Sequence, residues 1–524
     1  MTTTRTRLLR QLDRTLSILL ASIIFGTTLA FGGAVWWGRG FVVGSTFLIA
    51  LTWFVRCGVS GRWPVLWSPL TLLGSLAIGL AVAQLVPWPS PLAALLSPKA
   101  RAVHSLGVLP DLARSDDPSA VIPEPFTSRS PLTLDRAATL RWLVGASACL
   151  ALFWITSHYT DRFGRLSLIW GSVAAGFIVN GAIIAVQLSG QVNGLYGFIE
   201  PGKGPFWAPS TADVLEAPGR TVLRSSPASG DERSPWAFAS PVASPWFGTM
   251  QGGADAFLAL GSLALPICFA LTLQLMAPRG SREPLWSRLS LSGRGSLLVL
   301  LYVSTILCSF LVGLFTGRSL VWPFLAGLLA VGLPCLVGTG MRGKAFVLTL
   351  LTVGSLGGGL TLGDSWRSLF AESLGPPRAS TDWKPPRPSG MDWPILRDFP
   401  LVGVGLGAYS SATPYYKETA DTSTTAESTL AQWSTESGLA GLAVLGLALF
   451  WGLVRLPIAI ARVGSGDRAL AFGFVGTALC FFGYATMRWT VESAAVAVAA
   501  SVFAGTMNRW LSGGTDLLVE PSDA

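Results

Sequence analysis

Long apolar runs recur along this chain, and they constrain its fold more than any other feature. A helix of roughly 20 apolar residues crosses the hydrocarbon core of a bilayer. The sequence contains about twelve runs near that length, at 16–37, 41–56, 65–86, 137–157, 166–188, 254–276, 296–315, 320–340, 345–362, 437–457, 469–487 and 490–508. We therefore expect an all-α polytopic membrane protein with about twelve transmembrane helices.

Composition agrees with a membrane protein and argues against other classes. Charged residues make up only 12% of the chain, whereas soluble proteins carry about twice that share. The net charge of +9 is spread as short clusters between apolar runs, so we expect no nucleic-acid partner. All six cysteines fall at or inside apolar runs, and the two histidines are far apart in sequence, so we expect no metal and no cofactor.

The basic residues also indicate an orientation. With the N-terminus in the cytoplasm, the short inside segments hold most of the arginines, and the short outside turns hold only Arg39, Arg318 and Arg488. This asymmetry predicts that both termini are cytoplasmic. The first apolar run follows four arginines but is too long for a signal peptide, so we interpret it as a retained helix.

The same topology places three long loops, 87–136, 189–253 and 363–436, on the outer, periplasmic side. The chain then divides into helices 1–9 (1–362), a large outer loop before helix 10 (363–436), helices 10–12 (437–510) and a cytoplasmic tail (511–524). The first loop is rich in proline, and the second is rich in serine, proline and alanine.

The third loop contains the least ordinary stretch, at 393–442. A loop of this length between membrane helices costs backbone entropy that packing or function must offset. Gly403, Gly405 and Gly407 fall within five positions, and they let the backbone turn tightly and approach another group. We predict a helix start between Thr425 and Glu436, running into the next apolar run.

Arg318 lies between two apolar runs that almost no loop separates. A charged side chain at such a depth normally faces a cavity or a partner. Two interpretations stay open on depth alone, a guanidinium that binds a phosphate through two hydrogen bonds and an interfacial arginine that snorkels to lipid headgroups. Arg488 and Glu492 are four residues apart at a helix boundary and can simply pair with each other.

Glu427 and Glu436 are the acidic residues of the predicted helix start. Their nine-residue spacing is about two and a half helical turns, so they are not a carboxylate pair of the glycosidase kind. One of them can act as a base toward a hydroxyl acceptor. For Glu436 we favour a different role, compensation of the helix N-terminal dipole. For Glu427 the residues favour neither interpretation.

Two stretches together resemble the O-antigen ligase and polymerase superfamily. The string DFPLVGVGLGAY at 398–409, followed by ESTLAQWSTESGLAGL at 427–442, is similar to the signature loop and helix start of that family. The string FTGRS at 315–319 is similar to a family helix hairpin that carries an essential arginine. The positions that match the pattern of the helix start are Gln432, Glu436, Gly438, Leu439 and Gly441.

The chain departs from the family pattern in several polar positions. Glu427 and Ser428 stand where the family has histidine and asparagine. A family arginine ahead of the loop is replaced by Met391, and an asparagine-rich helix entry corresponds to 251–256 here.

The resemblance implies metal-independent glycosyl transfer at the outer face of a bacterial inner membrane, in envelope polysaccharide or lipopolysaccharide biosynthesis. The donor would be a glycan on a polyprenyl diphosphate, and the acceptor would be a hydroxyl of a saccharide or lipid-linked saccharide, with the polyprenyl tail held among membrane helices. The implied roles are Arg318 for the diphosphate, Glu427 as the base, and a substrate-binding set of Arg397, Gly403, Gly405, Gly407, Gln432 and Glu436.

Two alternatives to an active transferase remain at the level of sequence. One is a family member that has lost its chemistry and serves as a binding or assembly component of an envelope polysaccharide system. The other is a transporter, which suits the number of helices. Against the transporter, the chain has few intramembrane charges and no paired broken helices in matching halves.

Overall fold

The protein is an all-α, multi-pass membrane protein. The structure, a computed structural model, describes residues 2–30, 36–61, 63, 68–106, 129–160, 163–189, 246–247, 250–251, 253–276, 293–316, 318–338, 342–374, 392–413, 416, 426, 428–463, 468–488 and 493–512. Within these ranges, nine helices are long and apolar enough to cross a membrane, and two further apolar helices are shorter. The membrane class predicted from the apolar runs is confirmed, whereas the count of twelve crossings and their direction stay predictions.

Each of the twelve predicted runs overlaps a helix. These helices are α1 (Thr2–Leu29), α2 (Trp36–Ser60), α3 (Pro69–Leu85), α7 (Arg136–Tyr159), α8 (Phe163–Ser189), α10 (Gly253–Met276), α12 (Gly293–Phe315), α13 (Trp322–Gly338), α14 (Arg342–Leu374), α17 (Thr429–Arg462), α18 (Arg468–Met487) and α19 (Ala494–Leu511). The two shorter apolar helices are α3 and α13.

Smaller elements lie in the connections. They are β1 (Trp88–Pro89), α4 (Ser90–Leu96), α5 (Pro98–Leu106), β2 (Arg129–Ser130), β3 (Trp246–Phe247), β4 (Met250–Gln251), the 3₁₀ turn η3 (Arg318–Leu320), α15 (Asp392–Asp398) and α16 (Tyr409–Ala412). Strands β1 and β2 pair antiparallel with Trp88 opposite Ser130, and β3 and β4 pair with Trp246 opposite Gln251. The described start of the first predicted loop is therefore folded back on its end.

One predicted boundary was wrong. Helix α14 continues to Leu374, well past the predicted end of its apolar run at 362, because its last turns carry polar residues that periodicity of apolar residues does not detect. The helix start predicted between Thr425 and Glu436 is confirmed: α17 begins at Thr429, where Ser428 provides the N-cap by accepting a hydrogen bond from the Ala431 N–H at 3.2 Å.

Helix α10 forms the centre of the bundle. Its apolar window is entirely buried, and it contacts α8, α12, α13, α18 and α19. Two neighbouring helix pairs pack through glycine. A Cβ at Gly313 of α12 would lie 2.1 Å from the Leu356 carbonyl oxygen of α14, and one at Gly476 of α18 would lie 2.4 Å from the Gly327 carbonyl oxygen of α13. Such close backbone approach is typical of membrane helix pairs, in which small residues replace the hydrophobic effect as the basis of association.

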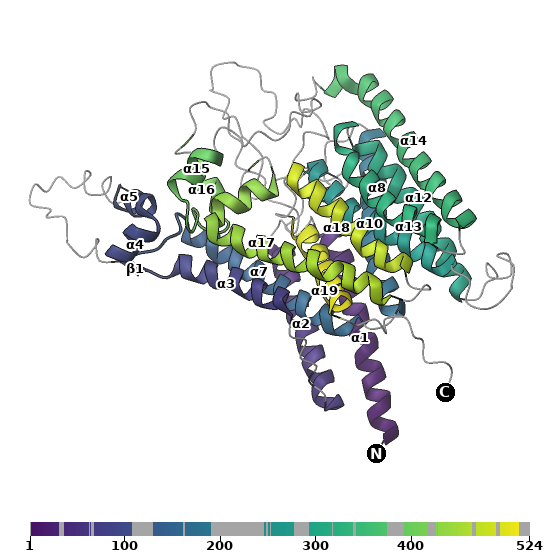
Figure 1. Cartoon of the computed structure of the whole chain (residues 1–524), viewed down its shortest axis with the longest axis horizontal. Helices are drawn as coiled ribbons and strands as arrows, with labels where there is room; N and C mark the ends of the chain where they lie inside the picture. Colours follow the sequence, from purple (N-terminus) through teal and green to yellow (C-terminus); the bar gives the residue numbers. More distant parts are fainter. Residues whose placement is uncertain are drawn as a thin grey trace, which may run out of the picture.

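The segment that contains α15 and α16 lies beside α4 and α5, at the left of Figure 1 and away from α12, α13 and α14. A small hydrophobic cluster joins these parts of the chain. Its buried members are Ala100, Ile395, Phe399, Val404, Tyr409, Ala412 and Ala426. The first and third predicted outer loops therefore pack on each other, at the ends of α3 and α17.

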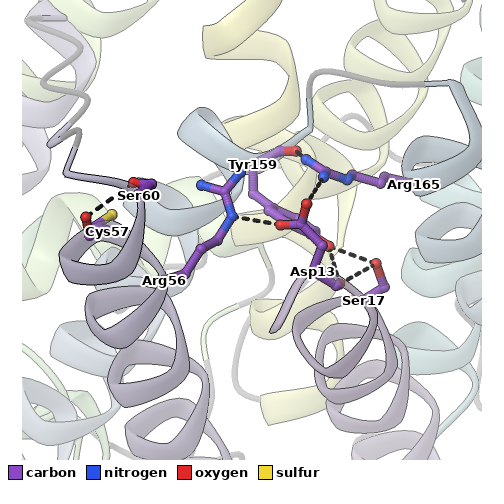
Figure 2. A network of polar contacts seen from close by, with 7 residues as sticks. All are labelled: Asp13, Ser17, Arg56, Cys57, Ser60, Tyr159 and Arg165. Atoms are coloured by element: carbon purple, nitrogen blue, oxygen red, sulfur yellow. Dashed lines mark hydrogen bonds and ion pairs between the residues drawn. The ribbon is translucent and has the colours of Figure 1, made fainter. Parts of the chain in front are cut away.

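A polar network ties helix α1 to its neighbours (Figure 2). The Asp13 carboxylate accepts hydrogen bonds from Arg56 Nε of α2 at 2.5 Å and from Arg165 Nη2 of α8 at 2.7 Å. Arg165 also lies over the Tyr159 ring, 4.2 Å from its centroid, and donates to the Tyr159 carbonyl oxygen. Both arginines were expected in inside segments, and the structure places them on one shared carboxylate.

Candidate functional site

The glycine-rich segment 400–409 lies across the first turns of α17. The N–H groups of Leu439 and Ala440 donate to the carbonyl oxygens of Pro400 and Leu401, at 2.8 and 3.0 Å. In the other direction, the Val404 N–H donates to the Thr435 carbonyl oxygen at 3.0 Å. These exchanges exist because α17 kinks at Gly438, whose φ of 61° and ψ of −156° interrupt the helical hydrogen-bond ladder.

Each glycine of the segment occupies a position that a residue with a side chain would fit poorly. Gly403, Gly405 and Gly407 all have positive φ, at 71°, 113° and 81°. A Cβ at Gly403 would lie 2.3 Å from the Glu436 backbone, and one at Gly405 would lie 2.0 Å from Thr133 Oγ1. The predicted close backbone approach is therefore present, and the approaching group is the protein itself.

The Glu436 side chain fastens this segment to α17. It is 3% exposed, and its carboxylate accepts hydrogen bonds from the Gly407 N–H at 2.9 Å, the Tyr409 N–H at 3.3 Å and Gln432 Nε2 at 2.9 Å. We favoured compensation of the helix dipole for Glu436, and that interpretation was wrong. Ser428 caps the helix at Thr429, and the Glu436 carboxylate, about two turns further along, binds N–H groups of the loop.

Gln84 of α3 is a second anchor, and the sequence analysis missed it. Its side chain is fully buried; Nε2 donates to the Val402 and Glu436 carbonyl oxygens at 2.6 and 3.1 Å, and Oε1 accepts from the Leu406 N–H at 2.9 Å. Its signal in the sequence is a single amide near the end of an apolar run. A buried amide must find partners, so its presence there indicates a polar contact.

The start of α7 completes this anchor. Asp135 caps α7 by accepting from the Ala138 N–H at 2.9 Å, and its other oxygen accepts from Ser411 Oγ at 2.8 Å. Arg397, predicted to bind substrate, is exposed in the last turn of α15. The structure thus brings Gly403, Gly405, Gly407, Gln432 and Glu436 together, with Arg397 on the nearby surface element.

Arg318 lies elsewhere along the chain, in η3 between α12 and α13, and it is exposed. Ring contacts on either side of η3 show what surrounds this turn. Phe315 packs edge-on against Phe257 of α10 at 5.5 Å between centroids, and Phe324 packs against Tyr484 of α18 at 5.8 Å. The Arg318 turn is therefore located at the N-terminal end of α10 and the C-terminal end of α18.

A polar cluster that the sequence analysis did not assemble occupies this same end. The Tyr484 hydroxyl donates to Asp255 Oδ1 at 2.9 Å, and Arg488 Nε lies 4.0 Å from the same oxygen. We expected Arg488 to pair with Glu492, which lies outside the described residues. The partner that the structure shows for Arg488 is Asp255, which is brought to it by the packing of α10 against α18.

The start of α17 joins this cluster through the backbone of Arg488. The Arg488 carbonyl oxygen accepts from both the N–H and the hydroxyl of Thr429, each at 3.3 Å. Glu427, the predicted base, lies outside the described residues, and its described neighbours Ala426 and Ser428 are buried. The two stretches that carry the resemblance, around Arg318 and around 427–442, are therefore linked through the end of α18.

No cluster of three or more histidine, cysteine, aspartate or glutamate side chains with metal-site geometry occurs in the described ranges. The predicted independence of metal stays a prediction. Comparison with protein-family models and with curated proteins finds no match for this sequence.

Proposed function

We propose that this protein is a membrane glycosyltransferase of the O-antigen ligase or polymerase type. It would transfer a glycan from a polyprenyl diphosphate donor to a hydroxyl of a saccharide acceptor at the outer face of a bacterial inner membrane. The proposal combines the resemblance of two separate sequence stretches with one observation, the convergence of their elements at a single end of the helical bundle.

That convergence is the observation that carries the proposal. Arg318 lies in the turn between Phe315 and Phe324, which pack against Phe257 of α10 and Tyr484 of α18. The end of α18 in turn accepts a hydrogen bond from the start of α17. A glycosyl transfer needs a cation for the departing diphosphate and a base for the attacking hydroxyl within reach of one substrate. The two stretches are far apart in sequence, so their convergence is not a consequence of chain connectivity.

The proposed reaction assigns one role to each candidate. The acceptor oxygen forms a bond to the anomeric carbon as the bond from that carbon to the diphosphate oxygen breaks. The acceptor proton passes to the Glu427 carboxylate, and Arg318 stabilises the charge that develops on the diphosphate. Gln432 donates a hydrogen bond to Glu436, and Glu436 accepts one from the Gly407 N–H. We therefore assign both residues to positioning of the segment 400–409.

Glycan transfer by the purified chain in proteoliposomes tests the proposal. The assay supplies polyprenyl-diphosphate-linked glycans and saccharide acceptors, and it compares the wild type with Arg318→Ala and Glu427→Gln. Arg39→Ala is the matched control, because Arg39 is another exposed arginine of a predicted outer turn. We expect each site variant to lower the transfer rate by at least about a hundredfold, the effect of losing one electrostatic or proton-transfer group, with little change for Arg39→Ala.

A binding or assembly component is the second candidate function. The observation that favours it is that the Glu436 carboxylate accepts three hydrogen bonds from its own protein. Absence of transfer with every donor, from a wild-type protein that is folded and monodisperse, would contradict the transferase and favour this candidate. Transfer that persists in Glu427→Gln would remove Glu427 from the mechanism.

A further inference from the structure

We propose that Arg488 is a second phosphate-binding residue of this site, positioned by Asp255 and Tyr484. The inference rests on the proposed function for the identity of its ligand, a prenyl-linked diphosphate. It extends that function with a residue in neither of the two stretches that carry the resemblance. The argument starts from how the guanidinium is held.

Three elements fix Arg488. Its carbonyl oxygen accepts two hydrogen bonds from Thr429 at the start of α17, so the backbone position is set. Its Nε faces Asp255 at 4.0 Å, and the same Asp255 oxygen accepts the Tyr484 hydroxyl at 2.9 Å. Tyr484 is fully buried, so its hydroxyl binds the Asp255 carboxylate from the interior of the bundle.

This arrangement leaves the outer edge of the guanidinium available. In the described part of the chain, Arg488 has no hydrogen bond or ion pair through its two terminal nitrogens, and its side chain is 29% exposed. A guanidinium that faces a carboxylate through Nε still presents two parallel N–H groups on its other edge, the geometry that matches two oxygens of a phosphate. Asp255 therefore orients the arginine and does not occupy its binding edge.

The charges around Arg488 also favour an anionic ligand. Among the described residues, Asp255 is the acidic side chain within 4.0 Å of Arg488, and a second arginine, Arg318, lies in the turn between Phe315 and Phe324, which pack on the same ends of α10 and α18. A diphosphate carries two phosphoryl groups, so one arginine for each group is the simplest match.

Binding of farnesyl diphosphate to the purified full chain in detergent, measured by calorimetry, tests this inference without requiring catalysis. We expect Arg488→Ala to raise Kd at least about tenfold, and Arg488→Gln to behave in the same way with a similar side-chain volume. Tyr484→Phe keeps the ring but removes the hydroxyl, so we expect a smaller rise of about threefold. Arg39→Ala is the control and should leave Kd unchanged.

Binding of farnesol, which has the same prenyl chain without phosphates, separates a phosphate contact of Arg488 from a general structural role of this residue. Its binding should be the same in all variants, because it lacks the phosphates that Arg488 contacts. Inorganic diphosphate as a competitor identifies the source of the anion. Displacement by inorganic diphosphate would indicate a site for the free ion as well, and failure to displace would indicate that the prenyl chain is required; both outcomes support the phosphate site.

The inference fails if wild type binds farnesyl diphosphate no better than farnesol, or if Arg488→Gln binds it as tightly as wild type does. It also fails if Arg488→Gln weakens farnesol binding to the same extent. Loss of diphosphate binding in Arg488→Gln, together with no glycan transfer by wild type, would sustain the inference and contradict the proposed transferase. The two proposals are therefore tested separately.

Discussion

At the scale of single residues, the positions with least freedom are those where two backbones meet. Gly405 sits against Thr133, and Gly438 sits against the carbonyl oxygen of Pro400. Neither position could accept a side chain without displacing a neighbour. Other glycines of the chain, such as Gly446 in α17, have open space around them and carry no such requirement.

We predict that Gly405→Ala destabilises the protein by about 3 kcal/mol, because it combines a positive φ with a clash against Thr133. Gly446→Ala is the matched control. It should be neutral or stabilising by up to about 1 kcal/mol, since alanine favours a helix more than glycine does. Thermal unfolding in detergent measures both. Equal melting temperatures for Gly405→Ala and wild type would contradict the packing of segment 400–409 on the start of α7.

Asp135 makes the stability of the fold depend on pH in the acidic range. Burial raises the pKa of Asp135, but hydrogen bonds from the Ala138 N–H and the Ser411 hydroxyl outweigh it and hold this pKa below the ordinary value. A carboxyl whose pKa is lower in the folded state contributes stability that is complete above its unfolded pKa of about 3.9. That stability is lost as the pH falls through the folded pKa.

We therefore predict that Asp135→Asn flattens the loss of thermal stability between about pH 5 and pH 3. Asparagine still caps α7 through its side-chain oxygen, so the effect at neutral pH is small. The measurement is the melting temperature against pH for wild type, Asp135→Asn and Ser411→Ala, with Ser411→Ala intermediate. Parallel curves for wild type and Asp135→Asn would contradict this role.

At the scale of elements, the helices are joined by a few polar contacts at their ends. Helix α1 is held by Asp13, whose carboxylate accepts hydrogen bonds from arginines of α2 and α8 (Figure 2). Helix α17 is held by Gln84 of α3 and by the segment 400–409. Apolar helices in a bilayer gain little from the hydrophobic effect on association, so polar contacts and glycine approach decide which helices are neighbours.

Removal of the Asp13 carboxylate should loosen helix α1. We predict that Asp13→Ala destabilises the protein by about 2 kcal/mol, because it leaves the guanidinium groups of Arg56 and Arg165 facing each other without a shared anion. Arg14→Ala, at an exposed position of the same helix, should change stability by less than about 0.5 kcal/mol. Thermal unfolding and proteolysis of the N-terminal helix measure the difference. Equal protease sensitivity of the two variants would contradict the role of Asp13 in holding helix α1.

At the scale of the whole molecule, the distribution of basic residues predicts the orientation in the membrane. We expect green fluorescent protein fused after residue 524 to fluoresce, and alkaline phosphatase at the same position to be inactive, because both termini are predicted to be cytoplasmic. Alkaline phosphatase inserted after residue 390, in the third predicted outer loop, should be active. The reverse pattern would contradict the orientation and, with it, an outer-face site.

Apolar runs alone determined that this is an all-α membrane protein. Each run overlaps a helix, because hydrocarbon forces a spanning backbone to satisfy its hydrogen bonds within a helix. The motif glycines and Glu436 also stood out in the sequence. Their partners did not, since the Glu436 carboxylate binds N–H groups of Gly407 and Tyr409, which lie 29 and 27 residues earlier in the sequence.

Tertiary structure alone decided which distant residues meet. Gln84, Asp255 and Tyr484 lie in three different apolar runs, and nothing local marks them as partners of segment 400–409 or of Arg488. Their meeting depends on helix order and close packing in the bundle. A periodic apolar pattern specifies that helices form, but it is nearly the same for every helix, so it does not specify which helices are neighbours.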